Sequence, residues 1–202
     1  MYNKLPRSFY ERDPLIVSME LLGKLLVRKK KKGEVVGKIV ETEAYIGPHD
    51  KASHAYGNKM TKRTLVQFGE RGHTYIFKIY GIHHCFCVVV GPRYTPAVTL
   101  IRSVEPVKGV KLMKKNRGLN NNVSIIRLTN GPSKVCQAFE ITKELNGIDL
   151  CGEDIFICEG AKFTFEVGKS KRIGIDYAEE YKDVLWRFYI KNNKFVSKKQ
   201  KE

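Results

Sequence analysis

Residues 39–45, which read Ile-Val-Glu-Thr-Glu-Ala-Tyr, constrain the fold of this chain more than any other stretch. Small and β-branched residues alternate there with two acids and a phenol: Val40, Thr42 and Ala44 against Glu41, Glu43 and Tyr45. Successive side chains of a β-strand point to opposite faces, so both carboxylates and the phenol share one face. Residues 46–50, Ile-Gly-Pro-His-Asp, then close the strand with a turn. The stretch therefore predicts a strand end, outside the ordinary core, that can hold a water molecule and a flat ligand together.

The rest of the sequence predicts short strands and helices without regular βαβ alternation. Asp13 is placed as the N-cap of a helix and Pro14 at its first position, with Gly23 as its end. Further helices are expected at residues 106–115 and 132–146, with a short one near residues 61–68. Strands are expected at residues 25–27, 35–45, 74–79, 85–90, 98–101, 155–157, 163–167 and 185–190. This pattern predicts an α+β fold, a single domain over residues 1–202 with a mainly antiparallel sheet and flanking helices.

The two strands at residues 74–79 and 85–90 are joined by Tyr80-Gly81-Ile82-His83-His84. This predicts a protruding β-hairpin whose tip is unusually large and apolar. In a basic protein, such a tip can act as a wedge pushed between bases, because phosphate contacts offset the cost of unstacking. The alternative is a tip packed beneath another loop.

A formal net charge of +16 over 202 residues indicates a polyanionic partner such as DNA or RNA. The Lys-rich turn at residues 28–33 could contact phosphates, but a solvated hairpin tip explains it at least as well. Residues 191–202 form a basic tail that we expect to be disordered. No apolar run approaches the roughly 20 residues that span a bilayer, and the first residues lack a secretion signal. We therefore expect a cytoplasmic protein, nucleoid-associated if bacterial, without a membrane partner.

Two carboxylates at positions i and i+2 of a strand are separated by roughly 6 to 7 Å and can share a site. That spacing is compatible with an inverting glycoside hydrolase, whose two acids must flank the bond from opposite sides. Neighbours on one strand more naturally supply one base and one supporting residue, and two surface acids are the simplest alternative. The group His83, His84, Cys85 and Cys87 lacks the spacing of a metal site, and five cysteines in irregular spacing favour reduced thiols. We expect no metal and no cofactor.

The chain resembles the alkyladenine (3-methyladenine) DNA glycosylases in four separated segments, residues 39–48, 75–85, 100–106 and 131–138. The segments occur in the same order as in that family, and the resemblance extends over nearly the whole chain, from about residue 15 to 190. The resemblance implies a curved antiparallel sheet and a monofunctional base-excision enzyme acting on damaged purines flipped out of double-stranded DNA. A single domain that clamps DNA needs no partner, so we expect a monomer. It assigns Glu43 as the general base for the attacking water and Arg102 as its partner. The remaining roles are a water-cradle carbonyl (Ile173), walls around the extruded base (Tyr45, His54, Phe77), intercalation (Tyr80 with Ile82 and His83) and phosphate contacts (Lys59, Arg63, Gly174).

The chain departs from many relatives at the pocket floor, where Cys87 stands in place of an asparagine. A thiol makes only weak hydrogen bonds, so selection against the amine of guanine is expected to differ. Two other functions are weighed against the glycosylase: a non-catalytic basic nucleic-acid-binding protein, in which Glu43 is structural, and a small-sugar glycosidase. Release of free 3-methyladenine from methylated DNA separates the enzyme from the binding protein. Binding to nucleic acid that is lost at high salt would argue against the small-sugar glycosidase.

Overall fold

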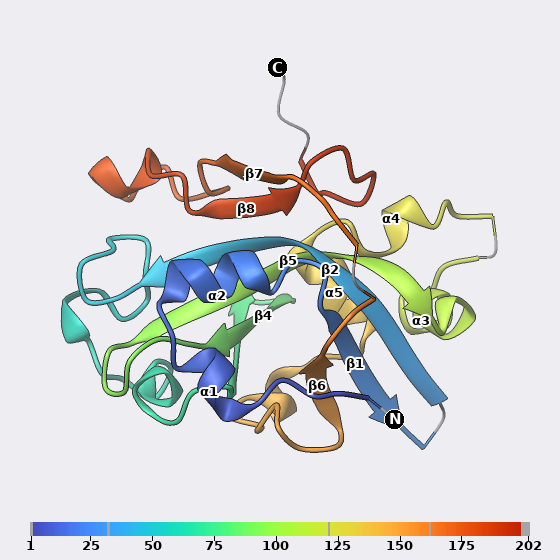
Figure 1. Ribbon diagram of the computed structural model, residues 1–202, viewed down its shortest axis with the longest axis horizontal. Coiled ribbons are helices and arrows are strands. Elements are labelled where there is room, and N and C mark those ends of the chain that lie inside the picture. Colours follow the sequence, from blue (N-terminus) through green and yellow to red (C-terminus); the bar gives the residue numbers. More distant parts are fainter. Residues whose placement is uncertain (1, 32, 121, 162, 199–202) are drawn as a thin grey trace.

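The computed structural model describes residues 2–31, 33–120, 122–161 and 163–198. Within them, one antiparallel sheet has the strand order β3-β4-β5-β2-β1-β6, and β8 pairs with both β2 and β7 (Figure 1). The strands are β1 (Leu25–Lys30), β2 (Gly33–Ile46), β3 (Thr74–Ile79), β4 (His83–Val89), β5 (Ala97–Lys108), β6 (Ile155–Cys158), β7 (Val167–Ser170) and β8 (Arg187–Ile190). The helices are α1 (Arg7–Tyr10), α2 (Pro14–Glu20), α3 (Val110–Asn116), α4 (Ile126–Thr129) and α5 (Pro132–Ala138). The α+β class with an antiparallel sheet is confirmed.

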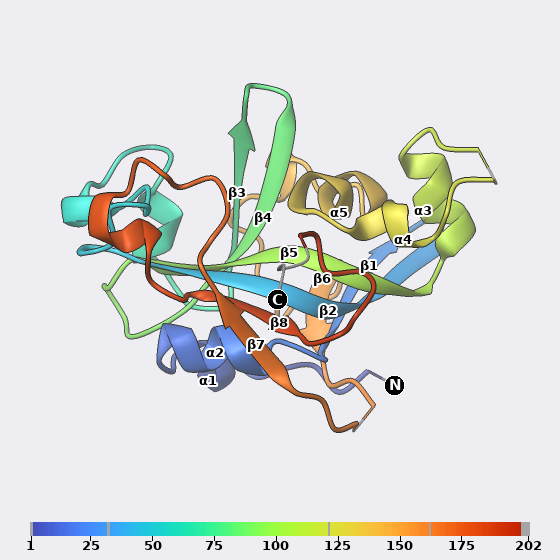
Figure 2. The same ribbon diagram turned by 90° about the horizontal axis from the view of Figure 1, so that it is seen from above.

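Helices cover both faces of the sheet. Figure 2 shows α1 and α2 on one face and α3 to α5 on the other, with the hairpin of β3 and β4 projecting on the side of α5. The alternation predicted for β2 puts Val40, Thr42 and Ala44 toward α2, where the Thr42 hydroxyl donates to the carbonyl of Ser18 at 2.8 Å. Burial of this apolar face against α2 fixes the register of β2, because a slip by one residue would turn the acids into the core.

The start of α2 is formed as the sequence predicts. The side chain of Asp13 accepts hydrogen bonds from the backbone amides of Leu15 at 2.9 Å and Ile16 at 3.0 Å, and Pro14 occupies the first helical position. An N-cap of this kind satisfies donors that have no partner inside the helix. In the described ranges, no helix has both the length and the apolar composition that crossing a membrane requires.

The helix predicted from residue 106 begins later than expected. β5 continues to Lys108, with Pro106 opposite Gly37 at a register shift, and α3 starts only after Gly109. Proline is tolerated in a strand where the hydrogen-bond ladder is interrupted, so Pro106 does not mark a helix start here. Two other boundaries also differ: α5 ends at Ala138, before the predicted stop at residues 146–147, and the strand predicted at 163–167 is found as β7 at Val167–Ser170.

The prediction of a disordered tail is wrong for residues 191–198. Phe195 packs against the main core, Val196 is only 9% exposed, and the backbone amide of Ser197 donates to the Glu41 carboxylate at 2.7 Å. Disorder was expected from the Lys-rich composition, but this segment also contains two apolar residues that pack against the core and a serine that binds Glu41. Residues 199–202, the remainder of that predicted tail, lie outside the described residues.

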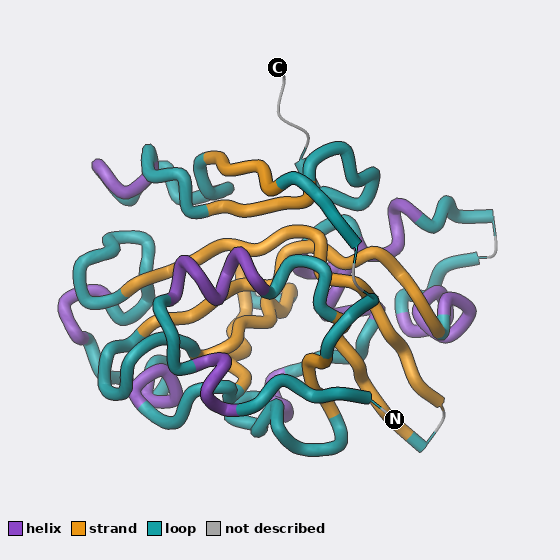
Figure 3. The backbone as a smooth tube through the Cα atoms, viewed as in Figure 1, coloured by secondary structure: helices purple, strands orange, loops and turns teal. Residues whose placement is uncertain are grey.

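Two long loops meet at one end of the sheet. Residues 47–73, which contain the short 3₁₀ turns Tyr56–Asn58 and Leu65–Phe68, lie beside residues 171–186 (Figures 2 and 3). They are joined by the Lys51–Glu179 ion pair at 2.6 Å and by a buried pair between Arg172 and Asp50. These loops, together with the ends of β2 to β5, enclose the cavity described next.

Candidate active site

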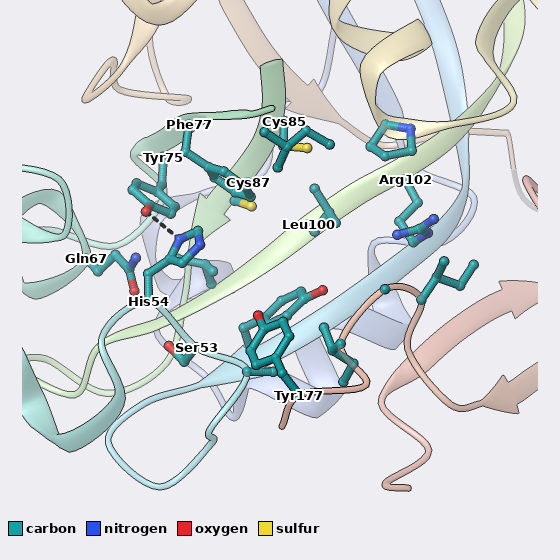
Figure 4. Close-up of a pocket in the computed structure, with 18 of the residues that line it drawn as sticks. Ser53, His54, Gln67, Tyr75, Phe77, Cys85, Cys87, Leu100, Arg102 and Tyr177 are labelled. Atoms are coloured by element: carbon teal, nitrogen blue, oxygen red, sulfur yellow. Dashed lines mark hydrogen bonds between the residues drawn. The ribbon is translucent and has the colours of Figure 1, made fainter. Parts of the chain in front are cut away.

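A cavity of about 440 Å³ opens where the sheet end meets the two loops (Figure 4). Its volume lies within the range of roughly 300 to 1,000 Å³ typical of small-molecule sites. The structure brings eight of the residues singled out from the sequence to its lining: Tyr45, His54, Phe77, Tyr80, Cys87, Arg102, Ile173 and Gly174. They come from four strands, the tip of the β3–β4 hairpin and both loops, so only the tertiary fold assembles them.

Aromatic rings form one wall of the cavity. The rings of His54 and Phe77 meet edge to face with centroids 4.6 Å apart, and Tyr75 lies 5.4 Å from Phe77. His54 is held at both nitrogens: Nδ1 lies 2.8 Å from the Tyr75 hydroxyl, and Nε2 accepts from Arg63 at 2.9 Å. Burial, together with the nearby Arg63 charge, lowers the pKa of His54 to about 4. His54 is therefore a neutral imidazole at physiological pH.

The floor of the cavity is apolar and carries Cys85, Cys87 and Leu100, of which Cys87 is only 1% exposed. Burial raises the pKa of both thiols, to about 11 for Cys85, so both are protonated at neutral pH. Both thiols are free of disulfide bonds. Over the part of the chain that the structure describes, no group of three or more His, Cys, Asp or Glu side chains could hold a metal ion.

Glu43 lies directly behind the cavity wall. Its carboxylate accepts hydrogen bonds from the Tyr45 hydroxyl at 2.8 Å, Arg102 Nη1 at 3.1 Å and the Ile173 amide at 2.8 Å. The bond to Tyr45 confirms that positions i and i+2 share a face of β2. Glu43 is fully buried and is absent from the lining, whereas its three donors all line the cavity. The sequence predicted that this strand face lies outside the ordinary core, whereas the Glu43 carboxylate is buried beneath its three donors.

Arg102 owes its direction to an irregularity in the sheet. Between β2 and β5 the register skips Val40 on one strand and Arg102 on the other, so Arg102 is an unpaired, bulged residue. Bulges re-aim side chains next to functional sites. The Arg102 guanidinium spans the two acids, with Nε 3.2 Å from Glu41 and Nη1 3.1 Å from Glu43. Burial alone raises the pKa of Glu41, but the charges of Arg102 and Arg187 outweigh it and lower that pKa, so Glu41 is ionised.

An ion pair that no sequence pattern indicated supports the loop containing Ile173. Arg172 forms two hydrogen bonds with the Asp50 carboxylate, at 2.5 and 2.8 Å, and both side chains are fully buried. The same guanidinium lies over the ring of Tyr45, 4.6 Å from its centroid. This pair joins the turn after β2 to the loop that delivers the Ile173 amide to Glu43. The partners are far apart in the chain, so no local motif could have indicated it.

The tip of the β3–β4 hairpin protrudes as predicted. Tyr80 is 90% exposed and Ile82 72% exposed, whereas His83 and His84, expected in the tip, belong to β4. Tyr80 adopts a φ of +50°, an uncommon conformation for a bulky residue. The three-residue tip therefore presents two apolar side chains to solvent beside the cavity mouth.

The residues predicted to meet phosphates have different surroundings. Lys59 and Gly174 are exposed, and Gly174 lies at the cavity lining. Arg63 is also exposed, but its guanidinium bonds to His54 and lies 5.3 Å from the centroid of the Phe77 ring. Arg63 therefore supports the cavity wall in this structure.

This combination of an antiparallel α+β fold, a protruding apolar hairpin and a buried carboxylate behind an aromatic cavity agrees with a family comparison. Residues 8–194 match the model of the methylpurine-DNA glycosylases, and the chain belongs to this family.

Relatives from three bacteria share nearly half of the sequence over almost the full length. A Clostridium acetobutylicum protein is 48% identical over 98% of this chain and 100% of its own length. Proteins from Clostridium novyi and Desulfitobacterium hafniense are each 47% identical over 97% of this chain and 99% of their own lengths. All three are provisionally named 3-methyladenine DNA glycosylase.

Proposed function

We propose that this protein is a monofunctional DNA glycosylase of base excision repair, which hydrolyses the N-glycosidic bond of alkylated purines flipped out of duplex DNA. The observation that carries the proposal is the Glu43 carboxylate, held by Arg102, Tyr45 and the Ile173 amide immediately behind an aromatic-lined cavity. The family and the provisional names of its relatives support the same activity.

Duplex DNA would be bound by the basic surface and opened by the hairpin tip. A base inside the duplex cannot present its glycosidic bond to a buried carboxylate, so extrusion precedes the chemistry. Tyr80 and Ile82, both exposed at the tip, would fill the gap that the extruded nucleotide leaves. The net charge of +16 favours bent, closely held DNA through phosphate contacts.

The cavity would recognise damage through its rings. A purine alkylated on a ring nitrogen carries positive charge, and a cation over an aromatic face gains on the order of 0.5 to 2 kcal/mol. Tyr45, Phe77 and a neutral His54 offer such faces, and the neutral imidazole adds no repulsion. Protonated Cys87 on the floor leaves the base edge without a strong hydrogen-bond partner.

Glu43 would act as the general base. A carboxylate oxygen can accept two hydrogen bonds, and among the described residues Oε1 of Glu43 accepts one, from the Ile173 amide. Because Glu43 is fully buried, the attacking water would have to enter between this oxygen and the donors that cover it. Arg102 would hold that water, together with the backbone carbonyl of Ile173. The carboxylate would take a proton from the water and stabilise positive charge developing on the sugar. A cationic leaving base needs no acid, so neutral lesions such as hypoxanthine would be released more slowly.

The lining of the cavity supports hydrolysis by water without a covalent intermediate. Over the described ranges, no lysine lines the cavity, so no amine is placed to form a Schiff base with the sugar. Borohydride is accordingly expected to trap no protein–DNA adduct. We further propose that the protein works as a monomer on chromosomal DNA in the cytoplasm.

Replacement of the general base, Glu43, tests the proposal. Glu43→Gln should abolish release of 3-methyladenine from methylated duplex DNA in single-turnover assays, while affinity for damaged DNA remains within a few-fold. The matched control is Glu153→Gln, which alters an exposed carboxylate paired with Lys4 and leaves release unchanged. A Glu43→Gln protein with near-normal release rates would refute the assignment. A wild-type protein that binds the DNA and releases no base would support a non-catalytic binding protein.

A further inference from the structure

The C-terminal segment, residues 193–198, reaches the buried acid that neighbours Glu43. Glu41 is fully buried and accepts five hydrogen bonds from the described residues. The donors are Arg102 Nε at 3.2 Å, Ser103 Oγ at 2.8 Å, Arg187 Nε at 2.6 Å, and the amide and hydroxyl of Ser197 at 2.7 and 2.9 Å. A carboxylate offers about four lone-pair sites, so these donors saturate Glu41 and hold it in one orientation.

Ser197 is itself anchored by the rest of the segment. Val196 is buried and Phe195 packs against the core, and the Asn193 side chain donates to Glu105 at 2.9 Å. Arg187 fixes the following residue, because its Nη2 donates to the carbonyl of Lys198 at 2.7 Å. The segment is thus attached at both ends around Glu41.

The charges in this interior balance. Glu41 and Glu43 carry two negative charges, and Arg102 and Arg187 carry two positive charges, all at exposures of 7% or less. Among the residues that the structure describes, only Arg102 contacts both acids, through different nitrogens of one planar group. A planar guanidinium fixed at Nε has little freedom at Nη1. The orientation of Glu41 is therefore transmitted to the contact between Arg102 and Glu43.

We propose that Glu41 and the C-terminal segment are positioning elements of the active site, which lock the Arg102 guanidinium in the orientation that holds Glu43. The inference rests on the proposed function of Glu43 and Arg102, and it assigns a role to residues that do not line the cavity. Without the segment, Glu41 loses two of its five donors and Arg102 gains freedom to swing into the cavity. An error of about 1 Å in such a position lowers the rate by as much as ~100-fold.

Two pairs of variants test the inference. Ser197→Ala removes one donor, whereas Ser197→Thr keeps a hydroxyl. A chain ending at Val196 lacks both donors, whereas a chain ending at Lys198 keeps every contact described above and serves as its control. We expect single-turnover base release to fall ~10-fold in Ser197→Ala and ~100-fold in the chain ending at Val196. The Thr variant and the control chain should retain the wild-type rate, and DNA affinity should stay within twofold for the two Ser197 variants.

A second readout does not depend on activity. The Arg102 Nε–H proton, assigned by its absence in Arg102→Lys, should exchange slowly with solvent in the wild-type protein and faster in Ser197→Ala. A Ser197→Ala protein with wild-type rate and wild-type exchange, or a Thr variant as slow as Ala, would overturn the inference. If the wild-type chain released no base, the proposed function would fail, and the exchange experiment would still decide whether Ser197 orders Arg102.

Discussion

The buried pair of Arg172 and Asp50 gives a quantitative prediction about stability. Both side chains are fully buried, with N–O distances of 2.5 and 2.8 Å, and Asp50 also accepts from the backbone amide of Ala52 at 2.9 Å. Asp50→Asn retains the size and some of the hydrogen bonds but removes the charge that balances Arg172. Removing one partner of a buried pair leaves an uncompensated cation, which costs about 3 to 5 kcal/mol.

That loss is a large part of the ~5 to 15 kcal/mol that stabilises an ordinary domain. For a chain of this size, about 1 kcal/mol corresponds to roughly 2 to 4 °C in Tm, so Asp50→Asn should melt about 6 to 20 °C below the wild type. Urea unfolding should show a lower midpoint with an unchanged m-value. Arg172 precedes Ile173, whose amide donates to Glu43. The rate of base release should therefore fall as well, when it is measured at temperatures at which the variant is still folded.

Two controls make the Asp50 prediction sharp. Lys51→Ala removes a neighbouring ion pair at the exposed Glu179, and its urea midpoint should match that of the wild type. The double variant Asp50→Asn with Arg172→Met removes both charges and should be more stable than Asp50→Asn alone. A loss below ~1 kcal/mol in Asp50→Asn, or a double variant no better than the single one, would show that the buried charge is compensated in some other way.

Two further predictions follow from the cavity and the hairpin tip. The pKa of His54 is lowered from 6.5 to about 4 in the folded protein, so the unfolded chain binds a proton more readily and stability falls as pH drops from 7 to 4. His54→Asn should reduce this pH-dependent loss of unfolding free energy by on the order of 3 kcal/mol. Urea titrations at several pH values measure the effect, and a pH dependence unchanged from that of the wild type would contradict the lowered pKa. Tyr80→Ala should leave the free energy of unfolding within ~0.5 kcal/mol, because the side chain is 90% exposed. Its affinity for duplex DNA and its rate of base release should each fall at least ~10-fold, and wild-type affinity would exclude the intercalating role.

Local sequence patterns were sufficient for most of the elements that form the cavity. The period-two alternation at residues 40–45 placed Glu43 and Tyr45 on one face, and their hydrogen bond at 2.8 Å confirms it. The hairpin of β3 and β4 and the Asp13 cap were also predicted from short stretches. Such features depend on neighbours within a few residues, and backbone geometry therefore determines them.

Features that depend on distant partners could not be read from these patterns. Pro106 lies in a strand because β2 is irregular opposite it, and Ser197 is ordered because it meets a buried carboxylate. The opposite was expected at both places: a helix from the local pattern at residues 106–115, and a disordered tail from the charged composition of residues 191–202. Tertiary contacts overrode local propensity in each case, because they satisfy buried groups at a lower free energy.

The sequence by itself determined which groups could do chemistry: an acid pair beside a phenol on one strand face, an apolar hairpin tip and a strongly basic surface. Only the tertiary structure decided how those groups are used. It placed Glu43 behind the cavity wall, aimed Arg102 through a bulge, paired Arg172 with Asp50 and brought Ser197 onto Glu41. The physical reason is that burying charge requires every donor and acceptor to find a partner, and those partners come from segments up to 156 residues apart.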